Sequence, residues 1–134
     1  MAEFSAVRSG PRSISSLVLP IPILCFVGAL CTDLAYRASG GTFLWLNFSS
    51  WLIACGLTFG GLCAVVMLIE TMGGRGWLPL LLLLAAWVVE FVNALVHARD
   101  GWTAVVPLGL TLSIVGSLLA LVSGWIWRST GDRR

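Results

Sequence analysis

Charge is what this sequence has least of. Charged residues make up 10% of the 134 positions, and all eight basic residues are arginines, because the chain contains no lysine. A soluble domain carries roughly 25% charged residues. Hydrophobic residues reach 58%, so the chain cannot build a normal water-facing surface and is expected to be an integral membrane protein. The net charge of +2 is too small to indicate a nucleic-acid partner.

Side chains that support chemistry are also scarce. His97 is the sole histidine, and four cysteines lie in apolar runs without forming a CxxC pair: Cys25, Cys31, Cys55 and Cys63. A single histidine with scattered acids lacks the spacing of a metal site. The sequence holds no Ser–His–Asp arrangement, nucleophile elbow or phosphate-binding loop. It therefore favours a non-enzymatic protein with reduced, buried cysteines and no metal.

Apolar segments are abundant, and each is close to the ~20 residues that cross a bilayer. Four spanning helices are predicted, at residues 19–37, 43–72, 77–98 and 104–127. They form a transmembrane domain (17–128) between a flexible N-terminal arm (1–16) and a tail (129–134). The links are short and rich in glycine, so sequential helices are expected to be antiparallel neighbours. The predicted fold is an all-α, up-down four-helix bundle in the membrane.

The arginines predict the orientation of this bundle. Six of them lie on the side of the two termini and of the link between the second and third helices, whereas Arg37 and Arg99 lie on the other side. Because basic residues accumulate on the cytoplasmic side of a membrane, both termini are expected in the cytoplasm. The expected location is a bacterial inner membrane, where the lipid bilayer itself is the first partner.

One helix face carries polar residues inside the predicted bilayer. Glu90, Asn93 and His97 follow the spacing i, i+3, i+7, which places them on the same side of the third helix. A charged carboxylate at the depth of Glu90 costs about 3 kcal/mol or more, so it must be protonated, paired or facing a cavity. A structural interhelix hydrogen bond and a proton or ligand site both remain open for this face.

A second group of polar residues is predicted at the outer face. Asp33 and Arg37 are four positions apart on the first helix, which permits an ion pair. Arg99 and Asp100 follow the third helix and reach the same side of the membrane. These four residues are expected to converge with His97, either as a charge network that closes the bundle or as a docking site.

Small residues recur at three- and four-residue intervals on the second and fourth helices. Such residues let helix backbones approach closely in lipid. The set comprises Gly56, Gly60, Ala64, Gly109, Ser113, Gly116, Ala120 and Gly124. They predict close packing, either within this chain or against another subunit or a second copy.

The run from Asn93 through His97-Ala98-Arg99-Asp100-Gly101-Trp102 to Pro107 has a recognisable pattern, followed by Gly109 to Ser113 and by Ser123-Gly124-Trp125. The first helix adds a proline-containing apolar run, Leu17 to Ile23, and the pair Asp33-Leu34. Over about residues 17–127 the chain resembles the bacterial membrane family catalogued as domain of unknown function 2231.

The resemblance implies a four-helix membrane protein without an established activity. Family members often carry histidines around the first proline, where this chain has Ser, Leu and Pro, which weakens any metal or haem assignment. Family members also occur near periplasmic dehydrogenases and other redox proteins, so a periplasmic redox partner is an expectation from the resemblance.

Haem can be tested against the residues themselves. A single histidine excludes bis-histidine ligation within one chain, and Met67 and Met72 are predicted at the opposite end of the bundle from His97. A five-coordinate haem, or one shared across a dimer, remains open, although no cofactor is predicted.

Two functions are therefore expected. The first is a non-enzymatic accessory subunit of a larger bacterial membrane complex, such as a respiratory or photosynthetic redox assembly. The alternative is a membrane redox or proton-handling protein that uses the face of Glu90, Asn93 and His97. A small-molecule transporter is a weaker third, because no inverted repeat is visible.

Overall fold

The computed structural model describes residues 13–99 and 105–131. All regular elements in this part of the chain are helical: α1 (Ile14–Val18), α2 (Pro20–Ala38), α3 (Phe43–Met72), α4 (Leu78–Ala98), η1 (Val105–Gly109) and α5 (Leu110–Gly131). Four helical stretches are long and apolar enough to cross a membrane: Ile14–Ala38, Phe43–Met72, Leu78–Ala98 and Val105–Gly131. The predicted class, an all-α membrane protein with four spanning helices, is confirmed.

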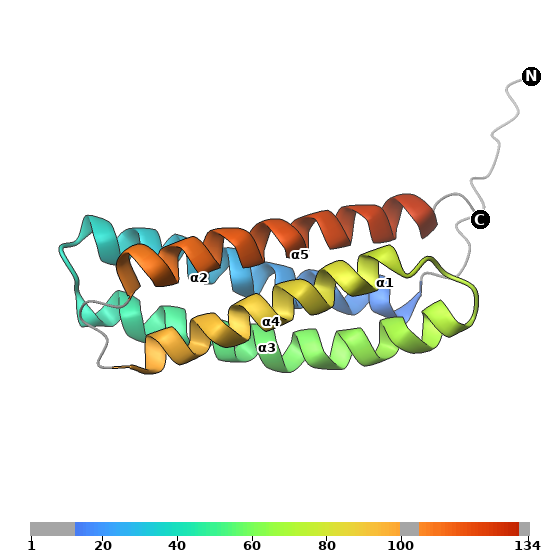
Figure 1. Ribbon diagram of the computed structural model, residues 1–134, viewed down its shortest axis with the longest axis horizontal. Helices are drawn as coiled ribbons and strands as arrows, with labels where there is room; N and C mark the ends of the chain where they lie inside the picture. The colour runs from blue at the N-terminus through green and yellow to red at the C-terminus, as the bar shows by residue number, and fades with distance from the viewer. Residues whose placement is uncertain (1–12, 100–104, 132–134) are drawn as a thin grey trace, which may run out of the picture.

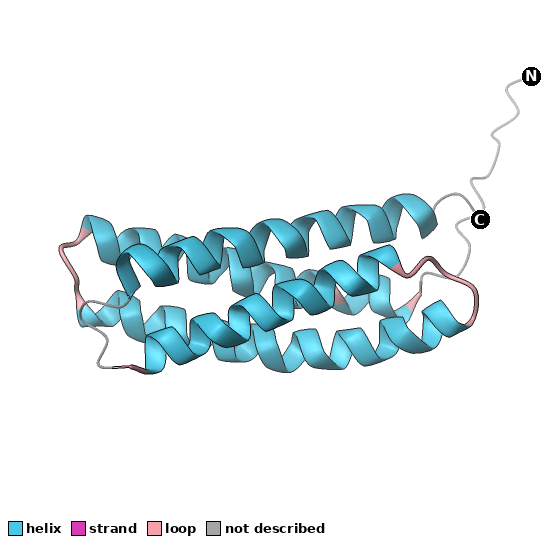
Figure 2. Cartoon of the chain, in the orientation of Figure 1, coloured by secondary structure: helices cyan, strands magenta, loops and turns pink. Residues whose placement is uncertain are grey.

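The four long helices form an up-down bundle (Figures 1 and 2). α2 packs against α3 and α5, and α4 packs against the same two helices. Helices that follow one another along the chain are thus antiparallel neighbours, as the short links predict. The start of α1, the link between α3 and α4 and the end of α5 lie at one end, here called the terminal end (Figure 1). The link between α2 and α3 and the element η1 lie at the opposite end.

Prolines and glycines set the helix boundaries. Pro20 begins α2, and Pro79 lies in the first turn of α4. Proline is tolerated there because the first N–H groups of a helix have no partner within the helix. Gly40 and Gly74 have φ angles of 72° and 104° in the two links. Because residues with a Cβ rarely adopt such angles, glycine lets the chain reverse within a few residues.

Helical structure continues into parts of the predicted arm and tail. Residues 1–12 of the predicted arm lie outside the described residues, but Ser15 is fully buried within α1. Its backbone N–H and its hydroxyl both donate to Glu70, which holds α1 against α3. At the other end α5 continues to Gly131, because nothing in the sequence interrupts the helix before it.

The interior of the bundle is divided along its length. Towards the terminal end it is mainly apolar and includes Trp127, Met67 and Leu83, none of them exposed, although Ser123 is also buried there and donates to the carbonyl oxygen of Pro79. Large apolar side chains also cover the outside, as Leu24, Phe48 and Leu121 illustrate. Such a surface fits contact with lipid. Towards the opposite end, the interior contains polar side chains.

Candidate functional site: a buried polar network

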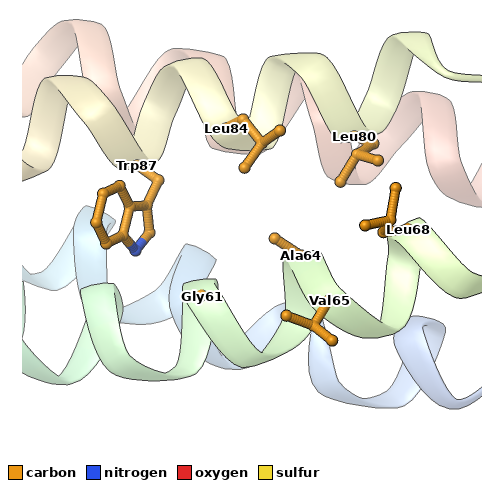
Figure 3. Close-up of a pocket in the computed structure, with 7 residues that line it drawn as sticks. All are labelled: Gly61, Ala64, Val65, Leu68, Leu80, Leu84 and Trp87. Atoms are coloured by element: carbon orange, nitrogen blue, oxygen red, sulfur yellow. The ribbon is translucent and has the colours of Figure 1, made fainter.

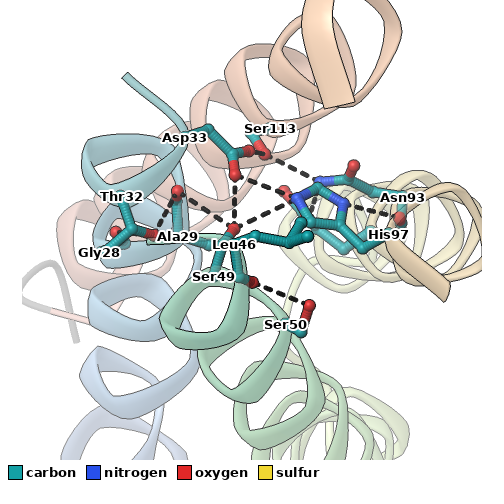
Figure 4. Close-up of polar contacts among 11 residues, drawn as sticks. Gly28, Ala29, Thr32, Asp33, Leu46, Ser49, Ser50, Asn93, His97 and Ser113 are labelled. Atoms are coloured by element: carbon teal, nitrogen blue, oxygen red, sulfur yellow. Dashed lines mark hydrogen bonds and ion pairs between the residues drawn. The ribbon is translucent and has the colours of Figure 1, made fainter. Parts of the chain in front are cut away.

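Every long helix contributes a polar side chain to one cluster inside the bundle (Figure 4). None of its members is more than 6% exposed. We call this cluster the polar network; it comprises Asp33 of α2, Ser49 of α3, Glu90, Asn93 and His97 of α4, and Ser113 of α5. The structure thus brings the predicted face of α4 together with residues from all three other long helices.

Asp33 accepts hydrogen bonds from three helices. Its Oδ1 atom accepts from Ser49 Oγ at 2.5 Å and contacts His97 Nε2 at 3.0 Å. Its Oδ2 atom accepts from Ser113 Oγ at 2.5 Å. An unpaired carboxylate in hydrocarbon is expensive, so this convergence of donors is what allows Asp33 to be buried.

The contacts of His97 define how many protons it shares with Asp33. Nδ1 lies 3.0 Å from the carbonyl oxygen of Asn93, which can only accept, so Nδ1 carries a hydrogen. The close contact between Nε2 and Asp33 Oδ1 then requires one further proton between them. The pair is either an imidazolium with a carboxylate or a neutral imidazole with a carboxylic acid. Both forms have zero net charge.

Neutrality matters because the pair lies within spanning helices. Adding a proton would leave a net positive charge in the bundle, and removing one would leave a net negative charge. A net charge on this buried pair would have no compensating ion among the described residues, which is costly. The geometry therefore favours a pair that keeps its single shared proton.

Asn93 connects this pair to Glu90. Its side-chain amide donates to Ser113 Oγ at 2.8 Å and to Glu90 Oε2 at 3.0 Å. Ser113 gives its own proton to Asp33, so it must accept from Asn93, and this fixes the orientation of the amide. Glu90 Oε1 and Asn93 Oδ1 are buried without a partner among the described residues. Asn93 is the one described donor to Glu90, and no described cation forms an ion pair with it.

Small residues of η1 and α5 make room for these polar side chains: Gly109 lies in η1 and Gly116 in α5. A β-carbon at Gly116 would overlap the carboxyl group of Glu90, and one at Gly109 would lie 3.1 Å from His97 Cε1. Ala120 and Gly124 are buried further along the same helix. On α3, Gly56 faces Phe26, and Gly60 and Ala64 are also buried. All eight small residues are therefore buried in this bundle, and two of them, Ala64 and Gly124, also line the grooves between helices.

The predicted outer-face cluster does not form around Asp33. Asp33 points towards the bundle axis and contacts His97, while Arg37 and Arg99 are exposed. Neither arginine forms an ion pair with a described residue, and Asp100 lies outside the described residues. An exposed pair at this spacing is worth only a few tenths of a kcal/mol, so three buried donors outweigh Arg37 as partners for Asp33.

Sequence reasoning missed Ser49 and gave Ser113 only a packing role. Both are serines in apolar runs, where a hydroxyl can be satisfied by its own helix or by a neighbour. The available signal was Asp33: it is an acid within a spanning segment, and the argument applied to Glu90 applies to it equally. Asp33 therefore required a buried partner on another helix.

A second polar cluster closes the terminal end. Glu70 Oε2 accepts from Ser15 Oγ at 2.6 Å and pairs with Arg75 Nη1 at 2.8 Å. The guanidinium carbon of Arg75 lies 4.2 Å from the centre of the Trp127 ring. We call Ser13, Ser15, Glu70, Arg75 and Trp127 the terminal cluster. Its contacts connect α1, α3 and α5, so we assign it a structural role.

The described residues contain no group of three histidine, cysteine or acidic side chains that could hold a metal ion. Both ring nitrogens of His97 are engaged within the bundle. Iron ligation by His97 would therefore require the loss of its contact with Asn93 or Asp33. This arrangement does not support the haem alternative.

The surface between α3 and α4 holds a groove of about 290 Å³. Its lining is apolar, with Trp87 at one end (Figure 3): Gly61, Ala64, Val65, Leu68, Leu80, Leu84 and Trp87. The indole N–H of Trp87 donates to the carbonyl oxygen of Leu57 at 2.8 Å. Nothing in this lining offers a reactive or charged group.

Fold and site together define a multi-pass helical membrane protein with an enclosed polar core. The family described as "Predicted membrane protein (DUF2231)" matches residues 12–126. The chain belongs to this family, which confirms the resemblance found in the sequence. No curated protein and no solved structure matches the chain.

Proposed function

We propose that the protein is a non-enzymatic accessory subunit of a larger bacterial membrane assembly. The observation that carries this proposal is the closure of the polar network. The six side chains form hydrogen bonds with one another inside the bundle, and none is more than 6% exposed; among the atoms of these side chains, only Glu90 Oε1 and Asn93 Oδ1 lack a described partner. A site that receives a substrate needs a cleft with polar groups directed into it. Here the polar groups hold the four helices in one arrangement instead.

The shape of the described chain supports the same proposal. The links Ser39–Thr42 and Gly73–Trp77 are too short to hold a catalytic domain. The outside is formed by large apolar side chains and by grooves between helices. A bundle of this kind contributes a fixed apolar surface to lipid and to other membrane subunits. The larger assembly that we propose as its partner is a respiratory or photosynthetic redox complex.

The test is the size of the species extracted from the native membrane. A tagged chain expressed at its native level is extracted in mild detergent and separated on a native gel. We expect it to migrate with an assembly much larger than its own 14.3 kDa. Oxidised and reduced absorption spectra of that band then show whether the assembly contains haem or pigment. Recovery only as a free monomer would contradict the proposal.

One observation favours proton handling as a second candidate. Glu90 Oε1 is buried and has no described partner, so this carboxyl group is the incompletely satisfied end of the polar network. A carboxyl group that exchanges its proton would use such a free oxygen. The other titratable groups of the network are Asp33 and His97, which together have zero net charge. If Glu90 loses its proton, the new negative charge therefore lies near a pair that is neutral overall.

Infrared spectroscopy separates the two candidates. The carbonyl stretch of a protonated Glu90 is assigned by its absence in Glu90→Gln and followed across roughly pH 5 to 9. The structural interpretation predicts a band that does not change over this range. Reversible loss of the band with rising pH would favour proton handling. Arg37→Gln is the matched control, because Arg37 is exposed and lies outside the network.

A further inference from the structure

A second groove, between the start of α2 and the end of α5, differs from the α3–α4 groove in one respect. It encloses about 370 Å³ and is lined by apolar side chains together with Arg128. The α3–α4 groove has no charged residue in its lining. Both grooves lie on the lipid-facing side of the bundle, so the arginine marks a difference in what each can bind.

Arg128 lies where a lipid headgroup would be. It occupies the last turn of α5, is exposed and forms no ion pair with a described residue. At 1.5 Å per residue, the 22 residues of α5 extend about 33 Å, close to the thickness of the hydrocarbon core. Trp125, one turn earlier, is 75% exposed, as is common for tryptophans at a membrane interface.

We propose that this groove binds an anionic phospholipid. One acyl chain lies along the apolar walls, which include Leu24 and Leu121, and the phosphate group binds the guanidinium of Arg128. A guanidinium matches phosphate geometry through paired N–H donors. Among the described residues, no acidic side chain lines the groove, so none of them competes for Arg128 or repels the phosphate.

Gly124 lies in the lining of the groove, where it has no side chain to occupy the space. A β-carbon at this position would lie 2.6 Å from Ile23 Cδ1 on α2. A side chain at this position would therefore displace the end of the Ile23 side chain, which itself lines the groove. The terminal end is also the end predicted to face the cytoplasm, where basic pockets between spanning helices bind anionic headgroups.

The proposal is tested by native mass spectrometry of the full chain. The protein is purified into mixed micelles that contain equal amounts of phosphatidylglycerol and phosphatidylcholine with identical acyl chains. We expect wild-type protein to retain phosphatidylglycerol in preference to phosphatidylcholine. Arg128→Gln should reduce that preference about fivefold, the effect of one basic residue near an anionic lipid surface.

Arg37→Gln is the matched control, because it removes the same charge from an exposed arginine at the opposite end of the bundle. It should leave the lipid preference unchanged. Equal retention of the two lipids by wild-type protein would overturn the proposal. So would an equal loss in the two variants, because the preference would then follow total charge rather than this groove. Unchanged unfolding of Arg128→Gln verifies that the fold is intact.

Discussion

Glu90 of α4 lies so close to Gly116 of α5 that a β-carbon at position 116 would overlap the carboxyl group. The glycine and the carboxyl group therefore occupy one space between two helices. A stripe of small residues in a membrane helix commonly permits backbone contact. In this bundle, part of the stripe instead provides volume for buried polar side chains.

Gly116→Ala should lower the free energy of unfolding by about 1 to 3 kcal/mol, the usual cost of overpacking. Glu90 is fully buried and cannot move aside easily. Equilibrium unfolding in mixed micelles with increasing denaturing detergent measures the change. Gly61→Ala is the control, because its β-carbon would lie 3.6 Å from Trp87 Nε1, an ordinary contact.

Adding Glu90→Ala removes the group that the alanine meets. The cost of Gly116→Ala should then fall to a few tenths of a kcal/mol in the double variant, which a double-mutant cycle detects. If Gly116→Ala costs the same with and without Glu90, the close approach is not what requires glycine there.

The sequence was sufficient for the four spanning helices, because apolar length and glycine-rich links are local signals. The common face of Glu90, Asn93 and His97 was equally predictable, since it follows from helical periodicity alone. The partner of Asp33 was not. Arg37 was the partner that local spacing allowed, whereas His97 is a partner across the bundle, selected by the rotation of α2 about its axis. That rotation depends on the packing of α2 against all of its neighbours. It therefore cannot be predicted from the spacing of residues within one helix.

The two alternative partners of Asp33 can be compared directly. In a double-mutant cycle, Asp33→Asn and His97→Gln should show a coupling of about 0.5 to 3 kcal/mol, as for residues in one hydrogen-bonded network. The same cycle with Arg37→Gln should show a coupling near zero, because Arg37 is exposed and forms no ion pair with a described residue. Asp33→Asn alone should be strongly destabilising, since breaking a buried pair typically costs about 3 to 5 kcal/mol. A coupling with Arg37 but not with His97 would contradict the network.

Ser113 is the bridge between the two halves of the polar network. It donates to Asp33 and accepts from Asn93, so Ser113→Ala removes one hydrogen bond to each. Hydrogen bonds between membrane helices contribute about 0.6 kcal/mol on average and up to about 1.7 kcal/mol. We expect the free energy of unfolding to fall by an amount near the upper value, because two hydrogen bonds are lost.

Thr111→Ala is the control for Ser113→Ala: the hydroxyl of Thr111 is exposed and bonds only within its own helical turn, to Pro107. Equal losses in the two variants would remove the bridging role.

The terminal cluster predicts a local effect rather than a global one. Arg75 donates to Ser13 and Glu70 and stacks on Trp127, but its side chain is partly exposed. A partly exposed ion pair contributes about 0.2 to 1 kcal/mol, and an exposed cation–π contact contributes about 0.5 to 1 kcal/mol. Arg75→Met keeps an apolar stem over Trp127 while it removes the charge. α1 should then be held against α3 only by the hydrogen bonds from Ser15 to Glu70, although the bundle stays folded. Hydrogen–deuterium exchange of the amides in α1 (Ile14–Val18) should then accelerate, and those around Asp33 and His97 should not change. Arg37→Gln serves as the charge-matched control, since Arg37 is exposed and lies at the opposite end of the bundle from α1. Uniform acceleration along all helices would show that Arg75 stabilises the whole bundle, and unchanged exchange in α1 would show that Ser15 and Glu70 suffice to hold it.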